Sequence, residues 1–178
     1  MSKEVHKYCG DGIVNKGHIA LSKIARKIEE AEIGSKELNQ IIETMRGELA
    51  SQDDGVAIAA PQVGESIRMF VVSPSAFHKN TKHFQTVYIN PRILKASKEK
   101  ELMLEGCLSV RWLYGDVERA KQVMIESLDE FGKRHVRGAS GLLAQIFQHE
   151  IDHLDGVLFD SKAINLQDLP PEAIKDAE

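Results

Sequence analysis

Apolar residues recur along the chain with two periods, and each period predicts a different kind of element. Helical spacing of apolar positions predicts amphipathic helices over residues 19–33 and 36–50, with a Gly-Ser pair ending the first and capping the second. A third helix is expected over residues 140–154, ended by an Asp-Gly pair. Its apolar side chains nearly encircle it, so this last helix should be buried.

Shorter apolar runs predict strands and the turns between them. A glycine in the loop at residues 129–133 tolerates a positive φ, which predicts a hairpin between the flanking strands. The first 18 residues and residues 165–178 show no clear period, so an irregular start and a loosely held tail are expected. The expected extended segments are 55–64, 67–72, 87–90 (closed by Pro91), parts of 93–104, the half-exposed strand 114–128 and its partner 133–136.

Composition is typical of a soluble globular protein. The 178 residues are 42% hydrophobic and 28% charged, and no boundary interrupts them, so a single domain spanning residues 1–178 is expected. The net charge of −4 gives no general reason to bind nucleic acid or an anionic membrane, and no apolar run approaches membrane-spanning length. Cys9 and Cys107 form no disulfide framework, and the first residues carry no signal-peptide pattern, so a cytoplasmic location is expected.

The candidate chemistry lies in the last predicted helix, in the stretch Gln-His-Glu-Ile-Asp-His-Leu-Asp-Gly at residues 148–156. Four residues advance an α-helix by about 400°, so His149 and His153 lie roughly 40° apart and both can reach one metal ion. Glu150 lies on a flank of the same face, where it can handle a proton from water. This pattern is typical of hydrolytic metal sites. The alternative is an amphipathic helix with two chance histidines.

A third protein ligand is needed, because two histidines alone do not hold a catalytic metal that leaves one position for water. The best candidate is Cys107, although a lone cysteine is more often a small buried apolar residue. Gly106 before it lets the backbone come close to a ligand or metal. Glu105 and Arg119 either pair behind the metal ligands or form a solvated surface pair, and both interpretations are open.

Three stretches together resemble the peptide deformylase family. They are Gly-Val-Ala-Ile-Ala-Ala-Pro-Gln-Val-Gly at residues 55–64, Glu-Gly-Cys-Leu-Ser at residues 105–109, and the histidine motif at residues 148–156. The resemblance covers roughly residues 36–160, whereas the first 35 residues diverge. It implies an α+β fold with antiparallel sheets packed around a central metal-binding helix. It also implies a metal-dependent hydrolase that removes the N-formyl group from the N-terminal formyl-methionine of nascent polypeptides and releases formate.

The same resemblance implies roles for the reacting groups. Glu150 takes a proton from the attacking water and returns it to the leaving amine. The Gln62 side-chain amide and the Leu108 backbone N–H stabilise the developing oxyanion. The implied metal ligands are Cys107, His149 and His153.

An apolar pocket is expected for the methionine side chain of the substrate. The family usually has glycine at the position of Ala57, so its methyl group is either accommodated or crowds the peptide that pairs with this strand. Arg111 stands where the family commonly has proline and, with Trp112 near the entrance, can shift peptide preference. Plain core packing is an open alternative for each pocket residue. The expected substrate-binding residues are Val56, Ala57, Ile58, Gly106, Leu142 and Ile146, with Met103 as a further candidate.

The metal and the partners follow from the motif and the resemblance. Thiolate plus two imidazoles suits zinc on affinity. The resemblance implies Fe²⁺ as the working ion, with Zn²⁺ as the alternative and Ni²⁺ or Co²⁺ able to substitute. The expected partners are N-formyl-methionyl peptides, with no direct nucleic-acid or membrane partner, and the acidic tail gives no support for ribosome docking. Two rival functions are open: a different His-Glu-x-x-His metallohydrolase such as a peptidase, and a non-catalytic metal-binding or peptide-binding homologue.

Overall fold

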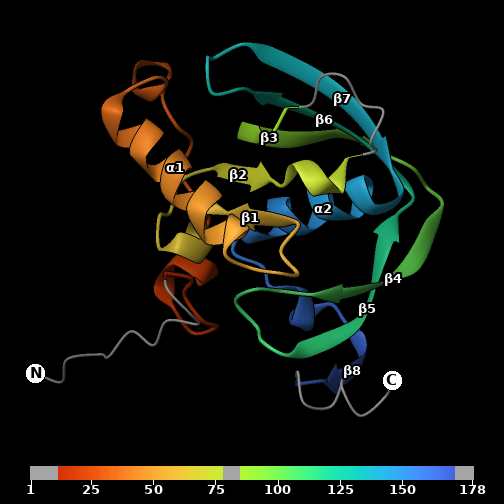
Figure 1. Ribbon diagram of the computed structural model, residues 1–178. Coiled ribbons are helices and arrows are strands. Elements are labelled where there is room, and N and C mark those ends of the chain that lie inside the picture. Colours follow the sequence, from red (N-terminus) through yellow and green to blue (C-terminus); the bar gives the residue numbers. More distant parts are fainter. Residues whose placement is uncertain (1–11, 78–84, 171–178) are drawn as a thin grey trace, which may run out of the picture.

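The fold is α+β, with two antiparallel sheets packed around one central helix (Figure 1). The computed structural model describes residues 12–77 and 85–170, and no helix within them is long and apolar enough to cross a membrane. The predicted fold class is confirmed. The helices are α1 (Lys36–Ala50) and α2 (Gly141–Leu154), with short 3₁₀ helices η1 (Ile19–Ser22), η2 (Glu30–Glu32), η3 (Ala60–Val63), η4 (Pro74–Ala76) and η5 (Phe159–Ser161). The strands are β1 (Ala57–Ala59), β2 (Met69–Val72), β3 (Val87–Ala96), β4 (Lys100–Gly106), β5 (Leu113–Ala120), β6 (Gln122–Leu128), β7 (Arg134–Ser140) and β8 (Ile164–Asp168).

The chain passes from one sheet to the other in the middle of a long bent ribbon. The large sheet has the strand order β1-β2-β3-β6-β7, and the small sheet has the order β4-β5-β8. β5 and β6 are separated only by Lys121, so the single strand predicted over 114–128 is two strands in two sheets. Gln148 of α2 stabilises the break, because its side-chain amide accepts from the Ala120 N–H at 2.9 Å and donates to the Ala120 carbonyl at 3.0 Å.

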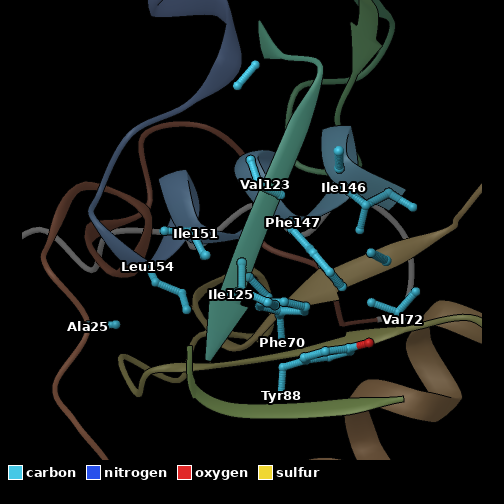
Figure 2. Close-up of a cluster of buried hydrophobic side chains, with 14 of the residues drawn as sticks. Ala25, Phe70, Val72, Tyr88, Val123, Ile125, Ile146, Phe147, Ile151 and Leu154 are labelled. Atoms are coloured by element: carbon cyan, nitrogen blue, oxygen red, sulfur yellow. The ribbon is translucent and has the colours of Figure 1, made fainter. Parts of the chain in front are cut away.

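Aromatic side chains form the core between α2 and the large sheet (Figure 2). Phe147 of α2 is fully buried, and its ring centroid lies 6.0 Å from that of Phe70 and 5.1 Å from that of Tyr88. Phe70 and Tyr88 stack on each other at 4.7 Å. A second apolar cluster fills the space between α1 and the opposite face of the same sheet. α2 is therefore packed as its nearly continuous apolar surface predicts.

The prediction of a helix over residues 19–33 is wrong. The segment contains only the short turns η1 and η2, with irregular chain between them. Its backbone pairs with distant partners: the Ala25 N–H donates to the Leu154 carbonyl at 2.8 Å, for example. Such tertiary bonds replace the local N–H to carbonyl bonds that a helix requires. Leu21, Ala25 and Ile28 of this segment are buried without helical backbone, whereas Ile19 and Ile24 are exposed.

Most other elements follow the predictions, with two further corrections. The helices predicted over 36–50 and 140–154 are present as α1 and α2. β3 does not end at Pro91 but passes through it, with a shift in its pairing to β6. The tail is not wholly loose, because Ile164–Asp168 forms β8 and pairs with β5.

Two groups of sequence-based expectations lie outside the described residues. Residues 171–178, the rest of the expected loose tail, are one group. The first eleven residues, with Cys9, are the other.

Replacing Phe147 by alanine should lower the free energy of unfolding by about 3–5 kcal/mol, because a buried ring is lost and a cavity remains. Urea denaturation followed by circular dichroism measures the change. Ile24→Ala is the matched control: this side chain is 77% exposed, so its truncation should change the free energy by less than about 0.5 kcal/mol. Equal effects of the two substitutions would show that the aromatic cluster does not hold α2 on the sheet.

Candidate metal centre and active site

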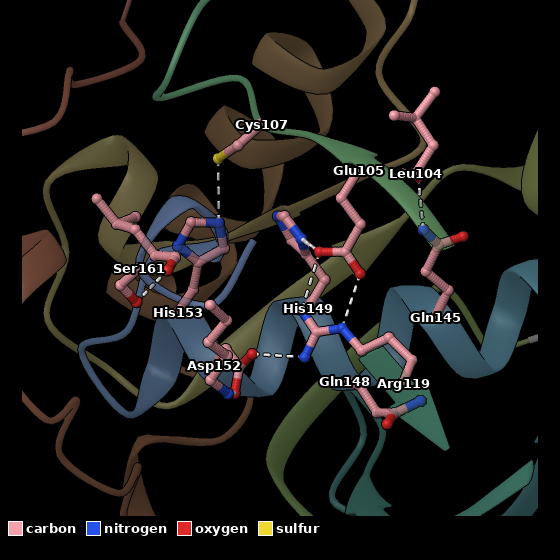
Figure 3. Close-up of polar contacts among 12 residues, drawn as sticks. Leu104, Glu105, Cys107, Arg119, Gln145, Gln148, His149, Asp152, His153 and Ser161 are labelled. Atoms are coloured by element: carbon pink, nitrogen blue, oxygen red, sulfur yellow. Dashed lines mark hydrogen bonds and ion pairs between the residues drawn. The ribbon is translucent and has the colours of Figure 1, made fainter. Parts of the chain in front are cut away.

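Side chains from α2 and from the loop after β4 point toward one another (Figure 3). α2 presents His149 and His153, whose ring centroids are 4.9 Å apart. Cys107 comes from the loop after β4, and its Sγ lies 3.3 Å from His153 Nε2. The candidate ligand atoms of these three residues all lie within 4.8 Å of one another, close enough to bind one metal ion.

The chemistry of this donor set fits a divalent metal ion. One thiolate and two imidazoles supply three ligands and leave a position open, as in catalytic metal sites. His149 Nδ1 lies 2.9 Å from Glu105 Oε2, so the ring donates through Nδ1 and keeps the Nε2 lone pair for an ion. Burial alone would lower the pKa of His149, but hydrogen bonds to Cys107 and Glu105 raise that pKa well above its usual value. Cys107 and Glu105 therefore favour a positive charge at His149, either a proton on Nε2 or a cation bound there.

A chain of ion pairs lies behind His149. Glu105 and Arg119 are each 4% exposed, and two hydrogen bonds of 2.7 and 2.9 Å join them. Arg119 also donates to Asp152 at 2.6 Å, and Asp152 pairs with Lys162. Burial opposes ionisation of Glu105, but hydrogen bonds from Arg119 and His149 lower its pKa to about 2. Of the two open interpretations, the solvated surface pair is wrong, because the two side chains pair behind a candidate metal ligand.

Gln62 is fixed with its amide N–H toward the cysteine loop. Its side chain is buried, and its Oε1 accepts the Ala59 N–H at 2.8 Å. This bond leaves Nε2 facing Ser109 Oγ at 3.3 Å and Cys107 Sγ at 3.6 Å. Because the carbonyl end is occupied by the backbone, the donor end of the amide is the one presented beside Cys107.

Glu150 follows His149 on α2 and is 4% exposed. Burial raises the pKa of its carboxyl group to about 7. A cation bound by the neighbouring ligands would lower that pKa and favour the ionised form. Within the described part of the chain, Oε2 of Glu150 has no hydrogen-bond partner, so this oxygen is available to accept a proton.

A pocket of about 260 Å³ lies beside these groups. Gln62, Cys107, His149 and Glu150 all line it, so the polar groups face one cavity. Such a pocket, mostly apolar with a few convergent polar groups, suits an apolar side chain held next to a polar reacting group. The apolar part of the wall includes Val56, Ala57, Leu104, Leu108, Leu142 and Ile146.

Comparison with known protein families identifies the family of this chain. The profile of the polypeptide deformylase family matches residues 11–168, nearly the whole chain. The chain belongs to the polypeptide deformylase family.

Individual relatives agree with this assignment. The peptide deformylase of Carboxydothermus hydrogenoformans is 40% identical over 154 residues, which cover 86% of this chain and 93% of the relative. That of Treponema pallidum (strain Nichols) is 47% identical over 105 residues, 59% of this chain and only 60% of the relative. A crystal structure of a class I type b peptide deformylase from Acinetobacter baumannii, with Met-Ala-Ser bound, has a TM-score of 0.74 and 35% identity, covering 84% of this chain and 96% of that one.

The deformylase match reaches further toward the N-terminus than the predicted 36–160. It begins at residue 11 and ends at residue 168, so most of the first 35 residues lie within the matched region. Part of this segment acts through its backbone: the Val14 N–H donates to the Gln62 carbonyl at 2.8 Å, for example. A hydrogen bond from the backbone can be made by almost any residue type. This explains why no recognisable sequence motif marks the region.

The pocket contains most of the predicted substrate-binding residues but not all. Ile58 does not line it: successive side chains on a strand point to opposite faces, and Ile58 packs in the cluster beside α1. The prediction for Ile58 is therefore wrong. Met103 is not among the lining residues either, whereas its neighbour Leu104 is. The predicted residues that do line the pocket are Val56, Ala57, Gly106, Leu142 and Ile146.

Gly106 is required for close packing within the small sheet. A Cβ atom at this position would lie 2.6 Å from Cε1 of Tyr114. Gly106 and Tyr114 are paired residues on β4 and β5. Glycine thus allows an aromatic ring to approach the backbone closely at this position.

The sequence did not indicate Gln145 as part of the pocket wall, and it placed Arg111 only near the entrance. Gln145 lies one turn before His149 on α2, and its Nε2 donates to the Leu104 carbonyl at 2.8 Å, which joins the helix to β4. Its spacing of four from His149 could have indicated it. Arg111, expected near the entrance, donates to both carboxylate oxygens of Asp54 at 2.8 and 3.1 Å. This ion pair joins two segments that line the pocket, one at Asp54 and one at Arg111.

Glu105→Gln should weaken metal retention about 10- to 100-fold, because the neutral amide no longer orients His149 or balances Arg119. Dialysis against a graded chelator series, followed by metal analysis, measures the change. Glu118→Gln is the matched control, since it removes a carboxylate on the neighbouring strand that is 61% exposed. Equal retention by the two variants would show that Glu105 does not support the metal ligand.

Proposed function

We propose that this protein removes the N-formyl group from the N-terminal formyl-methionine of nascent polypeptides and releases formate. The proposal is carried by one observation: three candidate metal ligands lie within 4.8 Å of one another, and two of them, Cys107 and His149, line one pocket together with a buried carboxylate and an oriented amide donor. Membership of the deformylase family supports the same activity. The acidic tail gives no reason to add ribosome docking to the proposal.

Fe²⁺ is the proposed working ion, with Zn²⁺ as the alternative and Ni²⁺ or Co²⁺ able to substitute. Cys107, His149 and His153 would hold it. When bound, the ion supplies Lewis-acid activation of water and of the formyl oxygen. Family resemblance supports iron, since the donor set by itself suits zinc at least as well. A thiolate ligand also favours a reducing compartment, which agrees with the proposed cytoplasmic location.

Glu150 is the proposed proton carrier. It accepts a proton as water attacks the formyl carbon, then returns that proton to the leaving amine. The buried position of its carboxylate and its unpaired Oε2, among the described residues, support this role.

Gln62 and Leu108 are the proposed donors to the oxyanion that develops on the formyl oxygen. The Gln62 amide is already oriented by its bond to the Ala59 N–H, so it needs no rearrangement during the reaction. The Leu108 backbone N–H follows Cys107 directly, and Leu108 lines the same pocket. Donors that are in place before the reaction stabilise the oxyanion of a tetrahedral intermediate more than the planar formyl group.

The methionine side chain of the substrate is proposed to enter the apolar part of the pocket, against Val56, Leu142 and Ile146. β1 is an edge strand of the large sheet, so its outer backbone edge can pair with an extended peptide. Ala57 lies on this strand and lines the pocket, where its methyl group would contact the bound residue. The Acinetobacter baumannii relative with Met-Ala-Ser bound supports a peptide that begins with methionine.

The test of this function is an assay with anaerobically prepared Fe²⁺ protein and three peptides. Formyl-Met-Ala-Ser should release formate, whereas acetyl-Met-Ala-Ser and a peptide with only internal bonds should be unchanged. Glu150→Gln is the matched variant: it should lower kcat about 100- to 10,000-fold, because the proton carrier is lost. Formate release, free amine and metal content are measured on the same samples.

Three outcomes would contradict parts of the proposal. Cleavage of the internal bond alone would indicate a peptidase. A metal-loaded protein that turns over no formyl peptide would indicate a non-catalytic homologue. A Glu150→Gln variant with the parent's kcat would show that another group moves the proton.

A further inference from the structure

The segment at residues 13–16 lies against the two loops that carry the proposed oxyanion donors. The Val14 N–H donates to the Gln62 carbonyl at 2.8 Å, and the Lys16 N–H donates to the Ser109 carbonyl at 2.8 Å. The segment, called here the N-terminal strap, therefore bonds to both loops through its backbone. Each bond ends on a residue that is itself a proposed donor or the immediate neighbour of one.

A third contact of the strap reaches the element that follows the metal-binding helix. The Lys16 side chain forms an ion pair with Asp160 of η5. Phe159, the first residue of η5, is 1% exposed, and its ring stacks on that of His149 with centroids 6.1 Å apart. The strap thus contacts three segments beside the candidate metal centre: the Gln62 loop, the cysteine loop and η5.

The strap is anchored firmly enough to act as a spacer. Ile13 and Val14 are 0% and 2% exposed, and Ile13 belongs to the apolar cluster beside α1. The direct side-chain contacts between the two loops are longer than the 2.8 Å backbone bonds of the strap. Gln62 Nε2 lies 3.3 Å from Ser109 Oγ and 3.6 Å from Cys107 Sγ. The two shorter backbone bonds of the strap are therefore the tighter constraint on the loop spacing.

We propose that the N-terminal strap is a positioning element for catalysis, and that its two backbone N–H groups set the spacing between the Gln62 amide and the Leu108 N–H. The inference rests on the proposed function, in which both groups donate to the formyl oxygen. Donor geometry matters steeply, because a misplacement of about 1 Å can cost on the order of 100-fold in rate.

Lys16→Pro and Lys16→Ala form a matched pair that isolates one strap bond. Both variants lose the lysine side chain, but only proline loses the N–H that donates to Ser109. The local turn accepts proline: the His18 N–H donates to the Asn15 carbonyl at 3.0 Å, and Gly17 has a φ of 101° at the third position. Turns of this type favour proline at the second position, which Lys16 occupies.

The expected result is a kcat for Lys16→Pro about 10- to 100-fold below that of Lys16→Ala, measured with formyl-Met-Ala-Ser. KM and metal content should be equal in the pair, because neither β1 nor the ligands are changed. Equal kcat values would overturn the strap proposal and leave the proposed function intact. A parent protein without deformylase activity would overturn both.

Ile13→Val and Ile13→Ala form a second series that does not depend on how well the proline variant folds. Both variants keep the two strap N–H groups and loosen only the apolar anchor. In samples shown by circular dichroism to be folded, kcat should fall stepwise from parent to valine to alanine at constant KM. Constant kcat through the series would overturn the proposal, and so would a KM that rises in step with the loss of kcat.

Discussion

The hydrogen bond between His149 and the buried Glu105 carboxylate joins the two parts of the fold that meet at the candidate metal centre. Glu105 lies on β4 in the small sheet, whereas His149 lies on α2, which packs on the large sheet. A charged carboxylate at 4% exposure is stable only with partners, and Arg119 supplies two hydrogen bonds while His149 supplies a third. Loss of any member would leave a buried charge unbalanced, so the orientation of the ligand and the stability of the fold depend on one cluster.

The need to pair buried polar groups also explains the polar residues of α2, a helix that is otherwise apolar around most of its surface. Gln145 bonds to β4, and Gln148 satisfies both backbone groups of Ala120 where the chain changes sheets. Asp152 accepts from Arg119. Each of these three side chains meets a defined partner, so burying them leaves few unsatisfied groups. Among the described residues, Glu150 Oε2 and His153 Nδ1 on the same helix are buried without a hydrogen-bond partner. The helix connects the two sheets through polar contacts and fills the core through apolar ones.

Residues close in sequence were the easiest to place. His149 and His153 are four apart, and helical geometry alone puts them on one face. Cys107 is different, because its approach depends on how β4 pairs with β5 and on how the small sheet meets α2. The residues alone made it only a candidate third ligand, and the family resemblance supported that choice. Ile58 could have been excluded by strand alternation, because a strand that turns Ala57 toward α2 must turn its next residue away.

Backbone pairing across long sequence distances accounts for the larger failures. Apolar spacing over 19–33 looks helical, yet the Ala25 N–H bonds to the carbonyl of Leu154, a partner that no local pattern reveals. The strap bonds from Val14 and Lys16 are of the same kind. Hydrogen bonds made by the backbone leave almost no trace in residue type, so they can be predicted only once the topology is known.

X-ray absorption spectroscopy on the zinc-loaded protein tests most directly whether Cys107, His149 and His153 hold one ion. One sulfur ligand is expected at about 2.3 Å and two imidazole nitrogens at about 2.0–2.1 Å. The sulfur contribution should disappear in Cys107→Ser, while the two nitrogen ligands persist. A first shell of nitrogen and oxygen alone in the parent protein would contradict the three-ligand centre.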